Sequence, residues 1–164
     1  MTVPTLTRHK GRAFSYDLAE PGHNFRMDEM RAALGRCQLA RLDEFNANRR
    51  RLAGQYRERL DKVKGIVLPA LGGRGISSCH IQPAFLDDHV DRKAFMQYMK
   101  QRRIQTSIHY PLAHEFSCYR EKYPNTFLPV SQEIGKRQVT LPLYASMSVD
   151  QVEMVCEAIK DFIA

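Results

Sequence analysis

A long run of apolar residues at helical spacing constrains the fold of this chain more than any other feature. Its members recur mostly every three, four or seven residues, as on one face of an α-helix: Met30, Leu34, Cys37, Leu42, Phe45, Leu52, Tyr56 and Leu60. The spacing predicts one amphipathic helix over residues 28–62. Asp28 and Glu29 open it, where negative charge suits the helix dipole. The interior glycines Gly35 and Gly54 each allow a kink or a close helix contact.

The residues after this helix predict a small sheet with helices. Strands are expected at residues 66–69, 78–86 and 104–110, and helices at residues 91–102, at residues 130–136 and from Ser148 onward. Ser148 and Gln151 form a capping-box pattern at the start of the last helix. Pro83 has no N–H to donate to a neighbouring strand, which favours an edge position or a bulge in the second strand.

These elements predict the fold class α/β (α+β). We expect an extended arm and loop over residues 1–26, the long helix over residues 27–64, and a small α/β domain over residues 65–164. In that domain an antiparallel sheet of about three strands is covered by helices. A chain of 164 residues with 43% hydrophobic composition is long enough for one domain with its own core.

The net charge of +7 and the pI near 9.4 favour anionic partners such as nucleotides, phosphosugars, nucleic acid or an acidic membrane surface. The densest basic cluster is Arg49, Arg50 and Arg51. Acidic residues lie near it on the same predicted helix, so the cluster is typical of a solvated helix face. Nucleic acid is disfavoured because aromatic residues do not interleave with the basic ones, as single-strand binders require.

Cysteine usage and apolar runs bear on the compartment. The cysteines Cys37, Cys79, Cys118 and Cys156 are widely separated and form no C-x-x-C pair, which argues against a disulfide framework or a zinc finger and favours a reducing cytoplasm. No stretch approaches the roughly 20 apolar residues that a membrane span needs. We therefore expect a cytoplasmic protein without a membrane partner.

Three other groups of residues invite a chemical interpretation that their spacing disfavours. Residues 72–75 are rich in glycine, but a strand is expected after them, where a phosphate loop would need a helix. His109 and His114 are five residues apart with a proline between them, which fits no usual zinc site, so no metal is expected. Cys79 and His80 are adjacent in a predicted strand and would point to opposite faces, which prevents a nucleophile and base pair.

Residues 21–27 carry the strongest local signal for a ligand. They combine a turn, an amide, an aromatic ring and a guanidinium just before a predicted helix N-terminus. Backbone N–H groups there favour a phosphate, Asn24 has an amide to donate, and Arg26 has a bidentate guanidinium. From the spacing alone, however, a simple capping turn with a surface arginine is the favoured alternative.

Several segments, taken in order, resemble the DegT/DnrJ/EryC1/StrS family of sugar aminotransferases. They are Arg8-His9-Lys10-Gly11, Tyr16-Asp17, Gly22-His23-Asn24-Phe25-Arg26-Met27-Asp28-Glu29, Ala32-Ala33-Leu34-Gly35, Gln38-Leu39, Arg41-Leu42, Ser77-Ser78 with His80, Arg103-Ile104-Gln105-Thr106-Ser107-Ile108-His109-Tyr110-Pro111 with His114, Leu128-Pro129-Val130 and Leu141-Pro142-Leu143-Tyr144. Their order and spacing cover nearly the whole chain.

The resemblance implies the carboxy-terminal part of a pyridoxal-phosphate-dependent enzyme, with the small domain of fold type I aminotransferases. In the family, the Schiff-base lysine, the ring stacked on the cofactor and the acid facing the pyridine nitrogen come from a preceding large domain. No lysine here stands in the family's lysine motif, so no catalytic residue and no covalently bound cofactor are expected, and the chain alone should be inactive. Its partners would be further copies of itself or a separately encoded large domain. Met1 would be an internal start, a cut site or the start of a split gene product.

The resemblance also implies site residues. Asn24 matches a loop that reaches across a dimer interface to the phosphate of a neighbour's pyridoxal phosphate, although His23 replaces the usual aromatic residue. Arg26 belongs to the same loop, and His109 and Tyr110 match a turn that lines the nucleotide-sugar side of the active site. The alternative function is a small basic module that binds a phosphorylated sugar, a nucleotide or nucleic acid.

Overall fold

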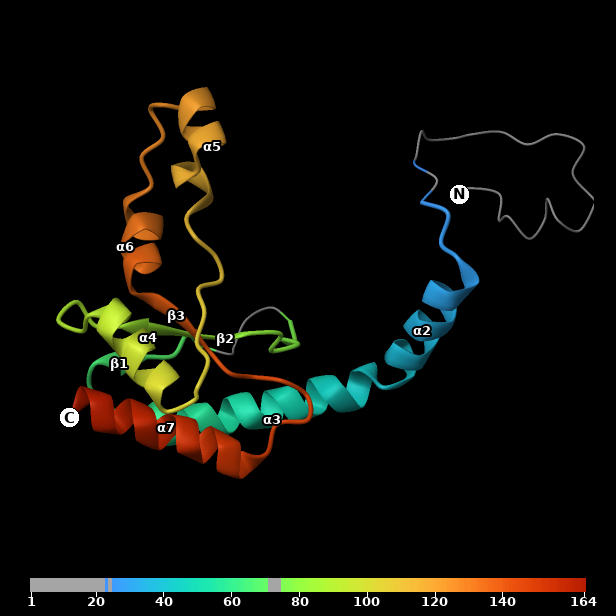
Figure 1. Ribbon diagram of the computed structural model, residues 1–164, viewed down its shortest axis with the longest axis horizontal. Coiled ribbons are helices and arrows are strands. Elements are labelled where there is room, and N and C mark those ends of the chain that lie inside the picture. The colour runs from blue at the N-terminus through green and yellow to red at the C-terminus, as the bar shows by residue number, and fades with distance from the viewer. Residues whose placement is uncertain (1–22, 24, 71–74) are drawn as a thin grey trace, which may run out of the picture. The chain divides into compact units, whose positions relative to one another are not determined.

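The computed structural model describes residues 23, 25–70 and 75–164, and the chain divides into two compact units, Met1–Leu39 and Ala40–Ala164. The second unit contains the sheet and most of the helices (Figure 1). Within the described ranges, no helix combines the length and the apolar character needed to cross a membrane.

Helix α2 (Glu29–Ala40) is the main described element of the first unit. Asp28 caps it: its Oδ1 accepts a hydrogen bond from the Arg31 N–H at 2.8 Å, and its carbonyl accepts one from the Ala32 N–H at 3.0 Å. None of the residues of α2 is buried, and Met30 and Leu34 are exposed. The described residues therefore leave the apolar side of α2 uncovered.

The single helix predicted over residues 28–62 is wrong, because it is interrupted at Arg41. Helix α3 (Leu42–Leu60) begins directly afterwards, and Arg41 has φ −104° and ψ −1°, outside regular helix geometry. Neither interior glycine causes the break. The apolar pattern itself changes phase here, since Cys37 and Leu42 are five positions apart, which no single helical face accommodates.

The sheet has three antiparallel strands in the order β1-β2-β3, which confirms the predicted small antiparallel sheet. The strands are β1 (Ile66–Val67), β2 (Gln82–Leu86) and β3 (Gln138–Leu141). In the register, Ile66 faces Leu86 and Ala84 faces Val139. Alternate residues of β2 are buried, as a strand with one face on the core requires.

The third strand was predicted in the wrong place. Residues 104–110 contribute only an isolated bridge between Ser107 and Thr140, and the third strand is β3 instead. All four residues of β3 are buried, so it lacks the polar and apolar alternation that marks a strand with one exposed face. Its polar members are accommodated because the Gln138 Nε2 donates a hydrogen bond to the Thr140 Oγ1 at 2.9 Å.

The edge position predicted for Pro83 is correct for this residue but not for its strand, since β2 as a whole is the central strand. Strand β1 is only two residues long and pairs no further along β2 than Phe85, whereas Pro83 pairs with Thr140 of β3. Within the described residues Pro83 therefore has a neighbouring strand on one side only.

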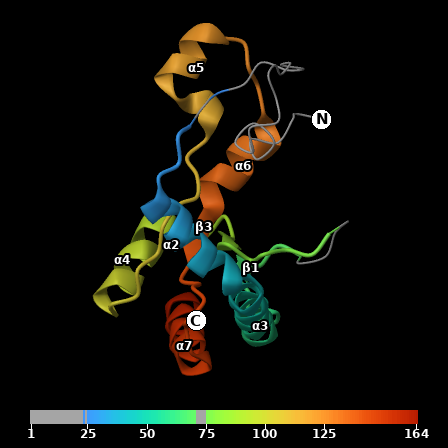
Figure 2. The ribbon, with the colours of Figure 1, turned by 90° about the vertical axis from the view of Figure 1, so that its right-hand side faces the viewer.

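Helices α3 and α7 (Val149–Ile163) lie side by side beneath the sheet, as Figures 1 and 2 show from two directions. Both helices contribute fully buried side chains to the core, among them Leu52, Tyr56, Val152 and Ile159. The predicted capping box is confirmed, because Ser148 and Gln151 exchange hydrogen bonds at the start of α7. Helix α4 (Arg92–Gln101), also predicted, is capped by the Asp91 carboxylate and contacts α7.

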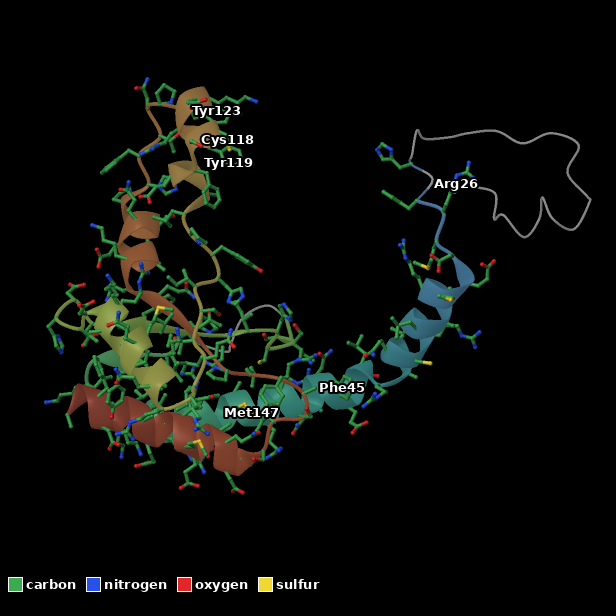
Figure 3. All side chains as sticks on the ribbon, in the orientation of Figure 1. Arg26, Phe45, Cys118, Tyr119, Tyr123 and Met147 are labelled. Carbon is green, nitrogen blue, oxygen red and sulfur yellow. The ribbon has the colours of Figure 1, made fainter. Side chains whose placement is uncertain are left out.

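The chain between α4 and β3 forms an extension that projects away from α3 and α7. It contains the short helix η1 (Ala113–Glu115), then α5 (Ser117–Lys122) and α6 (Pro129–Arg137), the last of which confirms the helix predicted at residues 130–136. No residue of α5 or α6 is buried. Figure 3 shows Cys118, Tyr119 and Tyr123 at the far end of this extension.

Candidate functional site

A cavity of about 460 Å³ lies between the end of β3 and the first turns of α7. Its polar lining comes from four parts of the chain: the segment before β2, the segment after α4, β3 with the loop that follows it, and α7. The polar lining residues are His80, Arg103, Gln105, Ser107, His109, Thr140, Tyr144 and Gln151. A cavity of this size, with a few convergent polar groups, suits a small organic ligand.

His109 is the best-positioned of the predicted site residues. Its half-buried ring has Nδ1 3.1 Å from the Ser107 Oγ, and it packs edge-on against the Tyr110 ring at 5.1 Å. Ser107 is itself fixed by two backbone hydrogen bonds with Thr140, at 3.2 and 2.7 Å. The Nε2 of His109 has no hydrogen-bond partner among the described residues, so this nitrogen is available to a ligand.

Tyr110 and His109 do not share the cavity. The Tyr110 side chain is 72% exposed and does not line the cavity that holds His109. Its role in substrate contact therefore stays a prediction that depends on a neighbouring surface.

Two further residues of the cavity had no role assigned from the sequence. The Gln151 Oε1 accepts a hydrogen bond from the Ser148 N–H at 3.0 Å, which completes the capping box, and another from the Tyr144 hydroxyl at 2.9 Å. The capping box was a visible signal for Gln151, and Tyr144 lies in the Leu141-Pro142-Leu143-Tyr144 segment. What the sequence did not reveal is that the cap of α7 also orients a tyrosine at the cavity.

The wall formed by residues 142–145 is held by α3. The Tyr56 hydroxyl donates a hydrogen bond to the Pro142 carbonyl at 2.8 Å, and the Asn48 side chain donates to the Ala145 carbonyl. Burial raises the pKa of Tyr56 well above its usual range, so this hydroxyl stays protonated and remains a donor. Helix α3 thus positions this wall of the cavity through two hydrogen bonds to residues far away in the sequence.

The basic cluster on α3 also has a supporting role. Arg49 Nε donates to the Ser78 carbonyl at 3.2 Å, and Arg50 Nη1 donates to the Ser77 carbonyl at 3.4 Å. These contacts fix the segment that leads to His80. Cys79 is buried and His80 is exposed, so the two do not form a reactive pair. The strand predicted over residues 78–86 begins only at Gln82, so both residues precede it.

The predicted anion site before α2 is partly described. Arg26 is exposed and has a left-handed backbone with φ 45°, and Figure 3 shows it in the segment before α2. Asn24 lies outside the described residues. The end of α2 already carries the Asp28 carboxylate, whose charge occupies the position where a phosphate would meet the helix terminus. A phosphate contact by Asn24 and Arg26 therefore stays a prediction.

Comparison with known proteins adds to this geometry. The family model for DegT/DnrJ/EryC1/StrS aminotransferases matches residues 2–160. The chain belongs to this aminotransferase family. It is 34% identical over 158 residues to the dTDP-3-amino-3,6-dideoxy-alpha-D-galactopyranose transaminase of Aneurinibacillus thermoaerophilus, covering 96% of this chain and 42% of that protein. It is 31% identical to the spore coat polysaccharide biosynthesis protein SpsC of Bacillus subtilis, over 90% of this chain and 40% of that protein.

Solved structures agree with the sequence relatives. The structure of DesV from S. venezuelae in complex with a ketimine intermediate superposes with a TM-score of 0.79 at 26% identity, covering 96% of this chain and 42% of that chain. The fold described above is thus that of one part of the fold type I sugar aminotransferases. The chain spans about two fifths of the length of the relatives it matches.

Three of the described lysines lack the surroundings that a covalently bound pyridoxal phosphate needs. Transamination requires a lysine amine that loses its proton readily beside an acid for the pyridine nitrogen. Lys160, the least exposed of the described lysines, donates a hydrogen bond to the Glu157 Oε1 at 2.8 Å, which raises its pKa and disfavours the free amine. Lys93 and Lys100 border a cavity that no acidic residue lines. Nor do the described residues gather three or more potential metal ligands in one place.

Proposed function

We propose that this chain provides the substrate-side surface of a pyridoxal-phosphate-dependent nucleotide-sugar aminotransferase and catalyses no transamination without a lysine-bearing domain. The observation that carries the proposal is the His109 cavity in a member of this aminotransferase family. The cavity presents a fixed imidazole with a free nitrogen, and none of its described lining residues is a lysine or a carboxylate that would make or break bonds.

In this proposal His109 binds and orients the nucleotide sugar. The hydrogen bond to Ser107 fixes the ring, so the Nε2 reaches a ligand oxygen without losing further rotational freedom. Tyr144 and Gln151 add polar contacts at the same cavity, and Tyr110 adds an exposed ring beside it. None of these residues needs to transfer a proton for this role.

The cofactor would be contacted through its phosphate. We assign this contact to Asn24, with Arg26 beside it, acting on a cofactor that is held by another chain or domain. The exposed apolar residues of α2 support an association with such a partner, because an uncovered apolar face favours packing against another surface. The partner is either a second copy of this chain within an oligomer or a separately encoded large domain.

A hybrid enzyme tests the proposal. This chain would replace the part of the Aneurinibacillus thermoaerophilus transaminase that it matches, leaving the remainder of that protein in place. We expect the hybrid to transaminate a dTDP-sugar and His109→Ala to lower kcat/KM about 10- to 100-fold, as loss of a hydrogen bond to a charged ligand would. Lys62→Ala, an exposed change outside the cavity, is the matched control and should leave kcat/KM unchanged.

Two results would contradict the proposal. One is a folded hybrid that binds pyridoxal phosphate but transaminates no nucleotide sugar. The other is an active hybrid in which His109→Ala and Lys62→Ala give the same kcat/KM.

A further inference from the structure

A second groove, of about 770 Å³, lies between α4 and the segment that follows it. After α4 the chain turns at Arg103, which has φ 61°, and runs back toward η1 and α5 (Figure 2). One face of α4 forms one wall of the groove, and residues 103–108 form the other. We call this feature the edge groove.

The wall formed by residues 103–108 includes an unpaired sheet edge at residues 106–108, since the N–H groups of Arg103 and Ile104 already donate to carbonyls at the end of α4. Ser107 uses both its N–H and its C=O in hydrogen bonds to Thr140 of β3. Since successive residues of an extended strand point these groups to opposite sides, Thr106 and Ile108 direct theirs away from β3. In the described part of the chain, the backbone groups of Thr106 and Ile108 have no hydrogen-bond partner, and both residues line the groove. Such an edge is a template for an added strand.

The groove has a basic rim. Lys93, Lys100 and Arg103 line it and form no ion pair with any described residue. Lys93 and Lys100 are seven residues apart on α4, which places them about 10 Å apart along the helix axis. The fourth cation, Arg92, is already engaged, because its Nη1 donates to the carbonyls of Gly135 and Gln138 at 2.5 and 3.3 Å. None of the described residues that line the groove is acidic.

The floor of the edge groove is apolar. Ile104 is buried, and Met96 and Ile108 are half-buried along it. An occupant therefore needs an extended backbone for the edge, negative side chains for the lysines and some apolar side chains for the floor. A helix N-terminus or a metal site plays no part in these requirements.

We propose that the edge groove binds an extended acidic peptide segment of a partner protein, which adds as a strand beside residues 106–108. Backbone hydrogen bonds from Thr106 and Ile108 give affinity, and Lys93 and Lys100 select for acidic side chains. A single-stranded nucleic acid fits less well, because the described lining residues include no aromatic side chain for bases to stack on. The edge groove shares Arg103, Ile104 and Gln105 with the His109 cavity, but neither lysine lines that cavity.

The test uses the purified 164-residue chain and an end-capped, fluorescently labelled heptapeptide in which Glu and Val alternate. We expect saturable binding by fluorescence anisotropy and slower hydrogen exchange at the Thr106 and Ile108 amides in the complex. The double substitution Lys93→Glu/Lys100→Glu should weaken binding at least about tenfold. Lys62→Glu/Lys64→Glu makes the same change in net charge at exposed lysines outside the groove and should alter binding less than about twofold.

A second peptide separates strand addition from simple charge attraction. It carries the same side chains but is N-methylated at every residue, which removes its backbone donors, and we expect at least about tenfold weaker binding. Equal binding of the two peptides, equal effects of the two double variants, or no binding would each overturn the proposal. So would an oligothymidylate that binds more tightly than the peptide and loses that binding in Lys93→Glu/Lys100→Glu.

Discussion

Replacing Tyr56 by Phe removes one oxygen atom from the core and tests how α3 supports the cavity wall. The Tyr56 hydroxyl is buried and donates to the Pro142 carbonyl at 2.8 Å. Without it, that carbonyl loses its partner, which costs roughly 1–3 kcal/mol of the free energy of unfolding. A small domain has about 5–15 kcal/mol in total, so the loss should be easily measured.

Tyr144→Phe is the matched control for this change. It removes the same atom, but Tyr144 is 46% exposed and its acceptor, the Gln151 Oε1, keeps the hydrogen bond from Ser148. We expect a loss within about 0.5 kcal/mol. Urea unfolding followed by far-UV circular dichroism at pH 7 measures both variants against the parent chain, and equal losses would refute the reasoning.

The pH dependence gives the same prediction a second readout. Burial raises the folded-state pKa of Tyr56 above the ordinary value of about 10, so its contribution to stability is complete below that pH and is lost as the pH rises above it. The unfolded parent chain ionises there and the folded one does not. The advantage of the parent chain over Tyr56→Phe should therefore shrink above pH 10 by up to about 1.4 kcal/mol per pH unit. A difference that stays constant to pH 11 would contradict this.

Two further predictions test the packing. Gly65→Ala should destabilise the chain by more than about 1 kcal/mol, because Gly65 has φ 96° and a Cβ there would lie 2.6 Å from the Ile163 Cγ2. Gly54→Ala in α3 places its Cβ in open space and should stabilise the chain by roughly 0.5–1 kcal/mol. The midpoints of urea unfolding measure both changes. In a thiol titration with Ellman's reagent at pH 8, two cysteines should react rapidly and two only on unfolding, and burial raises the pKa of one of the slow pair, Cys156, to about 12. The rapid pair is Cys37 and Cys118, and the slow pair is Cys79 and Cys156. Four equal rates would show that the described packing is wrong.

The sequence predicted the elements whose signals are local. The sequence predicts helix starts at Asp28, Asp91 and Ser148, and in the structure each of these side chains accepts a hydrogen bond that caps its helix. The family resemblance followed from ordered motifs and is confirmed over residues 2–160. Both kinds of signal depend on neighbours in the sequence, so no knowledge of tertiary contacts was needed.

The misplaced features depend on contacts between distant segments. Strand β3 shows no alternation because all its residues are buried, and Pro83 is possible in the central strand only because β1 is two residues long. The sequence names His109 as a candidate site residue but does not predict the cavity around it, for the same reason. His109 stands in a recognisable motif, whereas the contact of Gln151 with Tyr144 and the support from Tyr56 join parts of the chain that the pattern does not relate.

The central claim is that this chain provides binding surface and lacks the lysine chemistry of its family. The most direct measurement incubates the purified chain with increasing pyridoxal phosphate, reduces the mixture with borohydride and locates the modified lysines by peptide mass spectrometry. The account predicts slight, non-saturating modification spread over exposed lysines. Saturable modification of a single lysine at one cofactor per chain, with an absorbance band that borohydride abolishes, would contradict it.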